Sequence, residues 1–305
     1  MKEFAKLVLS SDFVYSIFRV TTPLLFASMG AVISDIAGVP NIALEGLMLM
    51  AAFAGMYFSF LFQSAAVGLI MALATAVAFA GILAFFTLYY KTNIILGGIA
   101  LNSLASGGTV FFLYLVAQDK GTSVSLASKT LPNLNIPIVQ SIPVIGKILS
   151  GHNILTYISV LAVVFTWLLL KRTSLGYHIR AVGEKKEAAE SVGISVVRTQ
   201  AAALLLSGLM CGFGGAFMSM GYVSWFSRDM VSGRGWIALA AEAMGRQTAV
   251  GSAATSLLFG VADAVSNAVA TMGLPSDMVK TIPYFATLIG LTVFSVRTWR
   301  KSQEA

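Results

Sequence analysis

Residues 46–90 read GLMLMAAFAGMYFSFLFQSAAVGLIMALATAVAFAGILAFFTLYY and contain no Asp, Glu, Lys or Arg. About 20 apolar residues are needed for one helix to cross the hydrocarbon core of a bilayer, so this stretch can hold two transmembrane helices. Similar uncharged stretches recur to the C-terminus. Because helices satisfy their own backbone hydrogen bonds in lipid, we expect an all-α polytopic membrane protein.

The composition agrees with that class. Hydrophobic residues make up 57% of the chain and charged residues 11%, whereas roughly 25% of residues are charged in a soluble domain. The net charge of +7 is spread over short segments between apolar stretches, which is typical of cytoplasmic loops rather than of a nucleic-acid-binding patch. The single Cys211 excludes an intrachain disulfide. Met1–Asp12 is amphipathic and resembles no cleavable signal, so we expect the first span to direct insertion.

We expect a single transmembrane domain over residues 1–305 with about 8–10 membrane segments. The seventh predicted segment is long enough for only half a span. The predicted segments are Asp12–Ser34, Asn41–Phe62, Ala65–Tyr90, Asn93–Val116, Asn153–Leu170, Thr199–Tyr222, Gly235–Met244, Gly251–Thr271 and Val279–Val296.

Charge predicts the orientation. The loop 171–198 is rich in Lys and Arg, so the positive-inside rule places it in the cytoplasm and the loop 118–152 outside. Counting spans back then puts the N-terminus outside, whereas Lys2, Lys6 and Arg19 favour the inside. Either the N-terminal segment lies on the membrane surface, or a re-entrant element over 35–46 alters the count.

A short internal repeat is visible. Asn41-Ile-Ala-Leu-Glu-Gly-Leu-Met48 resembles Trp236-Ile-Ala-Leu-Ala-Ala-Glu-Ala-Met244, and each copy follows a polar stretch that contains glycine. Irregular backbone at membrane depth is tolerated only where protein or a water-filled cavity satisfies it. Paired interrupted segments therefore predict two broken helices at a translocation site.

Glu45 and Glu242 are the leading polar candidates, because a carboxylate at the bilayer centre costs about 2.5–3.5 kcal/mol. Either they face a solute pathway or they bind backbone N–H groups at the start of a half-helix. We favour a structural hinge role for both, and for Asn41 and Asp35. Asn102 is a further pathway candidate, although amides in a bundle more commonly pack helices together.

Other intramembrane polar residues carry weaker signals. Asn93 and Asn102 flank Gly97-Gly98. Asp263 and Asn267 share a helix face and could pair with each other, with Arg246, or with no visible partner. Glycines at 208, 212, 214 and 215 predict close packing between helices.

The loop 171–198 contains a predicted short helix, Glu184–Val192, which Gly193 would end. Ala188 and Ala189 leave a smooth patch beside Glu187. A solvated loop helix is one interpretation; we favour a docking surface for a partner protein.

Several chemistries find no support in the sequence. No G-x-x-x-x-G-K-[ST] phosphate loop is present, and no His, Cys and carboxylate cluster has metal-ligand spacing. His152 and His178 are expected on opposite sides of the membrane. No nucleophile set for an enzyme is recognisable, so we expect neither cofactor nor metal.

The stretch Ser34-Asp-Ile-Ala-Gly-Val-Pro-Asn-Ile-Ala-Leu-Glu-Gly46 resembles the N-terminal signature of permease subunits of ABC importers in the branched-chain amino acid, ribose and nucleoside group. The nucleoside and simple-sugar permeases are the most similar branch. Further matching stretches lie at 94–105, 131–146, 180–194 and 233–240, in the right order. Departures are Asp35 where a Glu is usual, Ile94 where a Glu is common, and Pro40.

The resemblance implies a multi-pass protein of the inner membrane that works with other chains. These partners are cytoplasmic ABC ATPase subunits, an identical or paralogous second permease subunit, and an extracytoplasmic substrate-binding lipoprotein. By position, Glu187, Ala188, Ala189 and Gly193, together with Glu184, match the segment that couples to the ATPase. ATP hydrolysis is then expected on a separate chain.

We therefore expect the permease subunit of an ATP-driven importer, for nucleosides in the first place. Simple sugars and branched-chain amino acids are alternative solutes for the same machinery. An ion-coupled secondary transporter is a second class, since broken helices in repeats occur there too. It would work without an ATPase.

Overall fold

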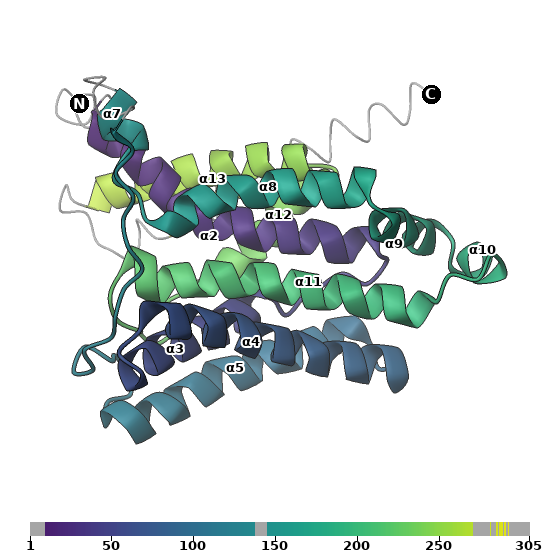
Figure 1. Cartoon of the computed structure of the whole chain (residues 1–305), viewed down its shortest axis with the longest axis horizontal. Helices are drawn as coiled ribbons and strands as arrows, with labels where there is room; N and C mark the ends of the chain where they lie inside the picture. Colours follow the sequence, from purple (N-terminus) through teal and green to yellow (C-terminus); the bar gives the residue numbers. More distant parts are fainter. Residues whose placement is uncertain are drawn as a thin grey trace.

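A computed structural model describes residues 10–137 and 145–270, together with residues 281, 285, 287, 288, 290 and 292. Within these residues the regular structure is helical, and the β contacts are the isolated bridges Thr122–Ser227 and Asn133–Asn153. Seven helices are long and apolar enough to cross a membrane, which confirms the polytopic all-α class (Figure 1). They are α2 (Ser11–Ile36), α3 (Leu44–Leu61), α4 (Ala65–Ala84), α5 (Ile94–Ala117), α8 (Ile154–Arg172), α11 (Val196–Phe217) and α13 (Ala249–Ala270).

The remaining helices are short. The π-helical turns η1 (Phe85–Tyr89) and η2 (Met218–Tyr222) extend α4 and α11, and the separate short helices are α7 (Ile145–Leu149), α9 (Ser174–Glu184), α10 (Lys186–Ser191) and α12 (Arg234–Met244). With 11 residues, α12 is about 16 Å long at 1.5 Å per residue. This is about half of the hydrocarbon core, as predicted for Gly235–Met244. The predicted segment Val279–Val296 lies largely outside the described residues.

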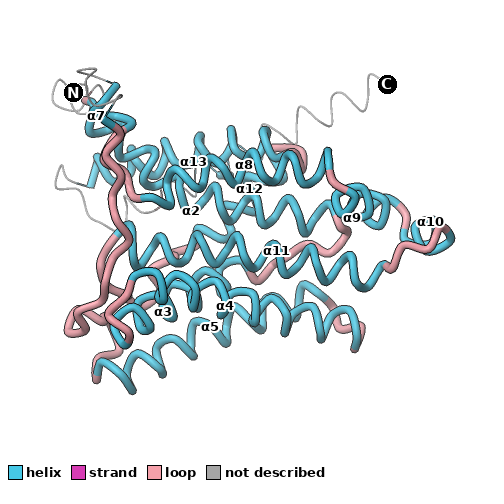
Figure 2. Tube along the Cα trace, in the orientation of Figure 1, coloured by secondary structure: helices cyan, strands magenta, loops and turns pink. Residues whose placement is uncertain are grey.

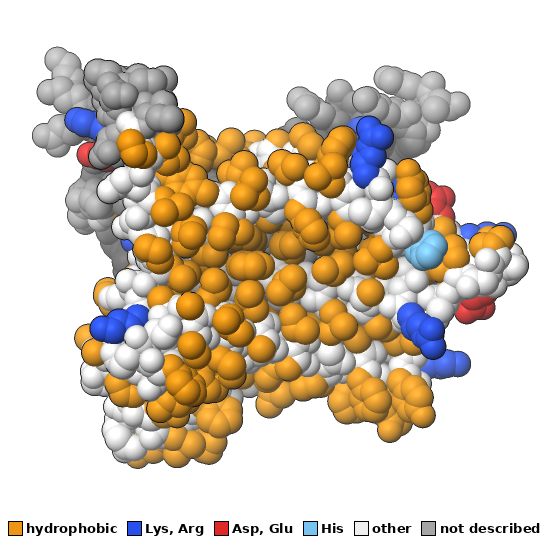
Figure 3. All heavy atoms as spheres, in the orientation of Figure 1, with side chains coloured by type: hydrophobic (Ala, Val, Ile, Leu, Met, Phe, Trp, Pro, Cys, Tyr) orange, Lys and Arg blue, Asp and Glu red, His pale blue; other side chains and the backbone are white. Residues whose placement is uncertain are grey.

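The bundle has two distinct ends (Figure 2). At one end, which we call the loop end, lie the connections 118–137, 150–153 and 223–233. At the other, which we call the basic end, α9 and α10 project beyond the long helices. Figure 3 shows hydrophobic side chains across the middle of one face and Lys and Arg near the two ends, as expected for a bundle that crosses a bilayer. His152 at the loop end and His178 in α9 lie at opposite ends.

The direction of α2 decides where the N-terminal part lies. The Tyr15 hydroxyl donates to the Gly151 carbonyl at 2.9 Å, and the Arg19 guanidinium stacks 4.5 Å from the centre of the Tyr222 ring. Helix α2 therefore begins at the loop end. In the sequence analysis Arg19 favoured a cytoplasmic N-terminus. The positive-inside rule counts only charges, so it takes no account of the Tyr222 ring that Arg19 contacts at the loop end. The chain then reaches the basic end at Ile36 and turns back, so α2 and α3 run in opposite directions.

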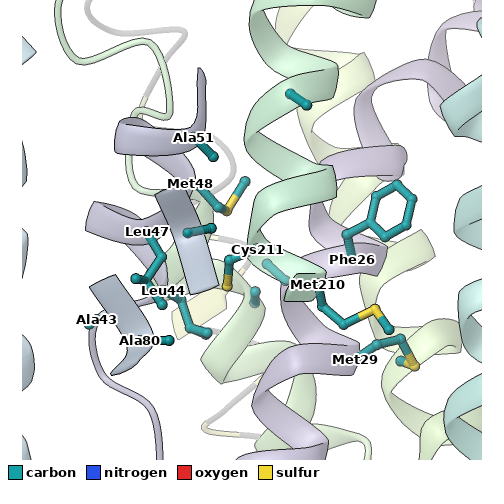
Figure 4. Packing of buried hydrophobic residues seen from close by; sticks show 14 of the residues in the cluster. Phe26, Met29, Ala43, Leu44, Leu47, Met48, Ala51, Ala80, Met210 and Cys211 are labelled. Carbon is teal, nitrogen blue, oxygen red and sulfur yellow. The ribbon is translucent and has the colours of Figure 1, made fainter. Parts of the chain in front are cut away.

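Helix α11 lies at the centre of the core. It packs against α4, α2 and α3 through the predicted glycines: a Cβ on Gly208 would lie 2.5 Å from the Cβ of Ala80, and one on Gly215 would overlap the Met48 carbonyl. Figure 4 shows the Cys211 side chain in the same cluster as Leu44 and Met48. Small residues let the backbones approach closely, so the helices around α11 have little room to shift independently.

These contacts predict the effect of one added methyl group. Gly208→Ala should lower the free energy of unfolding by about 1–3 kcal/mol, because an overpacked core must shift backbone. Gly107→Ala is the matched control, since no described atom lies within 4 Å of its Cβ position and alanine is the better helix former by about 0.5–1 kcal/mol. Thermal unfolding in detergent, followed by the folded fraction in size-exclusion chromatography, measures both. Equal midpoints for the two variants would contradict the packing described here.

Candidate functional site

The first break in the bundle separates α2 from α3 over residues 37–43. Asn41 is fully buried there: its side-chain Nδ2 donates to Ser207 Oγ at 2.9 Å, and its Oδ1 accepts from the Ala43 backbone N–H at 3.0 Å. The Asn41 backbone N–H donates to Ser34 Oγ at 3.2 Å. Side chains thus satisfy irregular backbone inside the protein, as a membrane interior requires. Asn41 lies where a hinge was predicted.

Asn102 of α5 binds the same break from the other side. Its Oδ1 accepts from the Gly46 N–H at 2.7 Å, and its Nδ2 donates to the Ile42 carbonyl at 2.9 Å. Glycine at position 98 permits this approach, because a Cβ there would lie 2.7 Å from the Ile42 side chain. The backbone at residues 42 and 46 therefore engages both ends of the Asn102 amide.

The second break precedes α12 and depends on Glu45. Gly233 stands at the N-cap position with φ of 77°, and no side-chain hydrogen bond from the N-cap residue satisfies the first turn. Instead, Glu45 Oε1 accepts from the Gly233 N–H and Oε2 from the Gly235 N–H, both at 2.7 Å. Glu45 itself lies in the first turn of α3. One carboxylate thus lies at the positive ends of two helices, where an anion is most stable.

An ion pair fixes the start of α12 to α13. Arg234 Nη2 lies 3.0 Å from Asp263 Oδ2, with side-chain exposures of 15% and 17%. Arg234 Nη1 also donates to the Val231 carbonyl at 3.1 Å. The sequence left Asn267, Arg246 or no visible partner open for Asp263, and its partner is instead Arg234. Helix spacing identified neighbours along α13 but not the residue that approaches from α12.

Glu242 lies at the opposite end of α12. It is 5% exposed, and its carboxyl group is within hydrogen-bonding reach of the Asp35 carboxyl on α2. Gln247 Nε2 donates to Asp35 Oδ2 at 2.5 Å. Glu45 and Glu242 both lie in the two similar stretches, but Glu45 follows the start of its helix and Glu242 precedes the end of its own. Helix α12 is consequently held at both ends by carboxylates.

The basic end carries the segment predicted to meet a partner. The expected single helix Glu184–Val192 is divided: α9 ends at Glu184, the chain bends at Lys185, and α10 covers Lys186–Ser191. Gly193 has φ of 84°, as expected of a residue that ends a helix. Ala189 is 3% exposed and packs with Val182 and Val196. The open side of α10 is formed by exposed side chains at 187, 188 and 190–192.

This segment rests directly on the first break. Gly183 in α9 lies so close to the end of α2 that a Cβ there would overlap the Ile36 carbonyl. Gln200 Nε2 of α11 donates to the Ala37 carbonyl at 3.0 Å. No pattern in the sequence indicates these contacts, because they join residues more than 140 positions apart.

At the loop end, the connections 118–137 and 223–233 meet. Ser123 N–H donates to the Phe226 carbonyl at 2.9 Å, and Leu131 N–H to the Met220 carbonyl at 2.8 Å. Between them lies a cavity of about 630 Å³. Its polar and aromatic lining includes Arg19, Asn133, Asn153, Tyr222 and Trp225. Over the described residues, no group of three His, Cys, Asp or Glu is placed to hold a metal.

Comparison with known proteins gives one family. The family described as the branched-chain amino acid transport system permease component matches residues 13–295. A nucleoside ABC transporter permease, NupC of Lactococcus lactis, is 30% identical and covers 95% of this chain and 92% of its own length. A guanosine ABC transporter permease, NupQ of Bacillus subtilis, is 32% identical over 89% of this chain and 88% of its own.

Sugar transporters and a solved structure are also similar. The glucose ABC transporter permease TsgB13 of Haloferax volcanii is 28% identical over 88% of this chain and 73% of its own. An inward-facing metal-chelate type ABC transporter has the same fold, with a TM-score of 0.53 and 18% identity over 94% of this chain and 85% of its own.

The Glu45 contacts predict a stability loss without a change of shape. Glu45→Gln keeps one acceptor but places an NH2 group against the second backbone N–H. Hydrogen bonds to charged groups contribute about 1.5–3 kcal/mol, so we expect the free energy of unfolding to fall by about that amount. Glu190→Gln on the exposed side of α10 is the control. Thermal midpoints in detergent measure both, and an unchanged midpoint for Glu45→Gln would mean that the carboxylate does not hold the break.

His152 at the loop end predicts a dependence on pH. Its ring is 3% exposed and stacks 3.9 Å from Tyr15, and burial lowers its pKa, as does the nearby Arg19 charge. Unfolded histidine titrates near pH 6.5, so acidification below about pH 6.5 protonates the unfolded chain first and stability falls.

The variant His152→Gln, which retains a donor for the Ile148 carbonyl, should therefore lose less stability than wild type between about pH 6.5 and 5. Thermal midpoints across this range test the difference. Parallel pH profiles would show that His152 is not the group responsible.

Proposed function

Since the chain belongs to the branched-chain amino acid transport system permease family and is an ABC transporter permease, we propose that it is the membrane subunit of an ATP-driven nucleoside importer of the inner membrane. NupC and NupQ, at 30% and 32% identity over most of the chain, are permeases for nucleosides and guanosine. The observation that carries the transport mechanism is the pair of broken helices joined at Glu45. A break lets two halves of a span move separately.

The basic end is the docking site for cytoplasmic ABC ATPase subunits in this proposal. Its Lys and Arg residues favour the cytoplasmic side. The exposed side of α10 offers Glu187, Ala188 and the 75%-exposed Val192. On the opposite, buried side of α10, Ala189 packs with Val182 of α9 and Val196 of α11, and this fastens α10 to both helices. A push on α10 is therefore transmitted to α9 without first compressing a flexible loop.

From α9 the movement reaches both breaks. Gly183 presses on the end of α2, where Asp35 meets Gln247 and Glu242 beside the end of α12. The start of α12 is bound to Glu45 of α3. Closure of the ATPases would therefore displace α2 and act on both ends of α12, which is the kind of small helix displacement that packed interfaces amplify.

A second permease subunit, identical or paralogous, would complete the pathway along α5. Only 22% of the most apolar window of α5 is buried inside this chain. Its uncovered face includes Ser103, Ser106 and Gly107, and hydroxyl groups suit a polar solute better than lipid. The centre of the bundle is filled by close contacts around α11, so a route between two subunits is favoured over a route through one. An extracytoplasmic substrate-binding lipoprotein would deliver solute at the loop end.

Uptake by cells that carry the permease with its partner chains tests the solute and the coupling together. Radiolabelled nucleosides should accumulate with wild type, and unlabelled nucleosides should compete better than glucose or branched-chain amino acids. Ala188→Arg, which places a bulky cation on the open side of α10, should reduce uptake at least tenfold and abolish co-purification of the ATPase. If a sugar competed with the labelled nucleoside more strongly than unlabelled nucleosides do, the solute would be reassigned, but the protein would remain an ABC importer subunit.

Ser125→Arg is the matched control, because Ser125 is exposed at the loop end. It should leave the ATPase bound. Full uptake by Ala188→Arg, or uptake driven by an ion gradient without any ATPase, would overturn the assignment of this end as the docking site.

A further inference from the structure

Two carboxyl groups meet where α2 and α12 end. Asp35 lies in the last turn of α2 and Glu242 in the last turn of α12. The carboxyl of Glu242 is within hydrogen-bonding reach of that of Asp35, and Gln247 Nε2 donates to Asp35 Oδ2 at 2.5 Å. Gln247 is directed there by a turn in which residues 246 and 247 both have positive φ. The ends of α2 and α12 therefore bring the two carboxyl groups together, and the turn at 246–247 holds Asp35 through Gln247.

The two helix ends that carry this pair supply no positive charge. Helix C-termini carry partial negative charge, and these two described helices have no basic residue in their last turns. The described ion pair, Arg234–Asp263, lies at the other end of α12, as does Glu45. The charged and titratable residues at this end of the neighbouring described segments are Lys171 and Arg172 in the last turn of α8, His178, Arg180 and Glu184 on α9, Arg198 on α11, and Arg246 beside Gln247. The described contacts include no ion pair between any of them and Asp35 or Glu242.

Burial makes a charge on Glu242 costly, while Asp35 beside it is half-buried. Glu242 is 5% exposed, and its Oε1 has no hydrogen-bond partner among the described residues. Two ionised carboxylates in contact repel strongly, and one of them gives up its charge. A hydrogen bond between two carboxyl groups also requires a proton on one of them. Because Asp35 already accepts from Gln247, it is the acceptor.

We infer that Asp35 and Glu242 form a proton-binding site, in which the Glu242 carboxylic acid donates its O–H to the Asp35 carboxylate. The bound proton fastens the end of α12 to the end of α2. Its departure to water leaves two adjacent charges and opens this contact. Within the proposed function, this would make the step that moves α12 away from α2 dependent on proton release at the basic end; the proton site itself does not rest on that function.

Infrared spectroscopy detects such a proton directly. The full chain, reconstituted in lipid vesicles at neutral pH, should show the carbonyl-stretch band of a protonated carboxylic acid, and Glu242→Gln should lack it. Asp35→Asn should shift the band, because the hydrogen-bond acceptor changes. Glu190→Gln, on exposed α10, should retain the full band. Absence of a band in wild type, or a band that Asp35→Asn leaves unmoved, would overturn the site.

The alternative occupant, a metal cation, is tested in the same samples. Replacing Na⁺ and K⁺ by a large organic cation should leave the band unchanged. A band that arises only after this replacement would show that a cation, not a proton, balances the carboxylates, and would overturn the inference.

Hydrogen–deuterium exchange measures how firmly the end of α12 is held against the end of α2. After correction for intrinsic rates, residues 241–248 should exchange several-fold faster once alkaline pH removes the infrared band. Glu242→Gln keeps a donor that does not titrate, so this response should disappear, while residues 94–100 serve as the internal reference. Equal pH responses in wild type and Glu242→Gln would overturn the fastening role. Failure of nucleoside uptake alone would affect only the proposed function.

Discussion

A broken helix inside a bilayer exposes backbone N–H groups that no water can satisfy, and Glu45 meets that constraint for this bundle. Its carboxylate binds the first turn of α12 while its own backbone belongs to the first turn of α3. Anion and helix dipoles therefore stabilise one another across the break. Without this acceptor the half-helix could not begin at this depth, and α12, its ion pair with α13 and its contact with α2 would lose their positions.

Carboxyl groups hold both ends of α12, but the helix dipole is favourable to a negative charge at the start and unfavourable at the end. At the start, a carboxylate faces helix N-termini, so charge and dipole agree, and the attachment needs nothing further. At the end, Asp35 and Glu242 face helix C-termini without a basic partner in the described last turns. The contact between Asp35 and Glu242 is stable only while a bound proton removes one of the two negative charges. A segment that is fixed at one end and conditionally held at the other is suited to pivot.

The long uncharged stretches predicted the helices well, because the thickness of a bilayer fixes the length of a span whatever the side chains do. The half-length of Gly235–Met244 was predicted for the same reason. The partners of the polar residues could not be predicted. Glu45 binds backbone 188 positions away, and the short repeat does not show that Glu242 lies near the end of its helix rather than near the start. One signal was available: Gly233 has no side chain to cap α12, so an acceptor had to come from another helix.

The burial of Ala189 has a similar explanation. In a short, charged segment the sequence shows small residues but not which of them faces inward, since that depends on the bend at Lys185 and on Val182 and Val196 from the flanking helices. The placement of α9 against the break in α2 then follows a mechanical requirement. A continuous helix packed through glycines to its neighbours moves only as a whole, so a force applied along it is shared by the entire bundle. A force applied at residues 37–43 meets backbone held by a few side-chain hydrogen bonds, and can change the relation between two spans while the packed core around α11 stays intact.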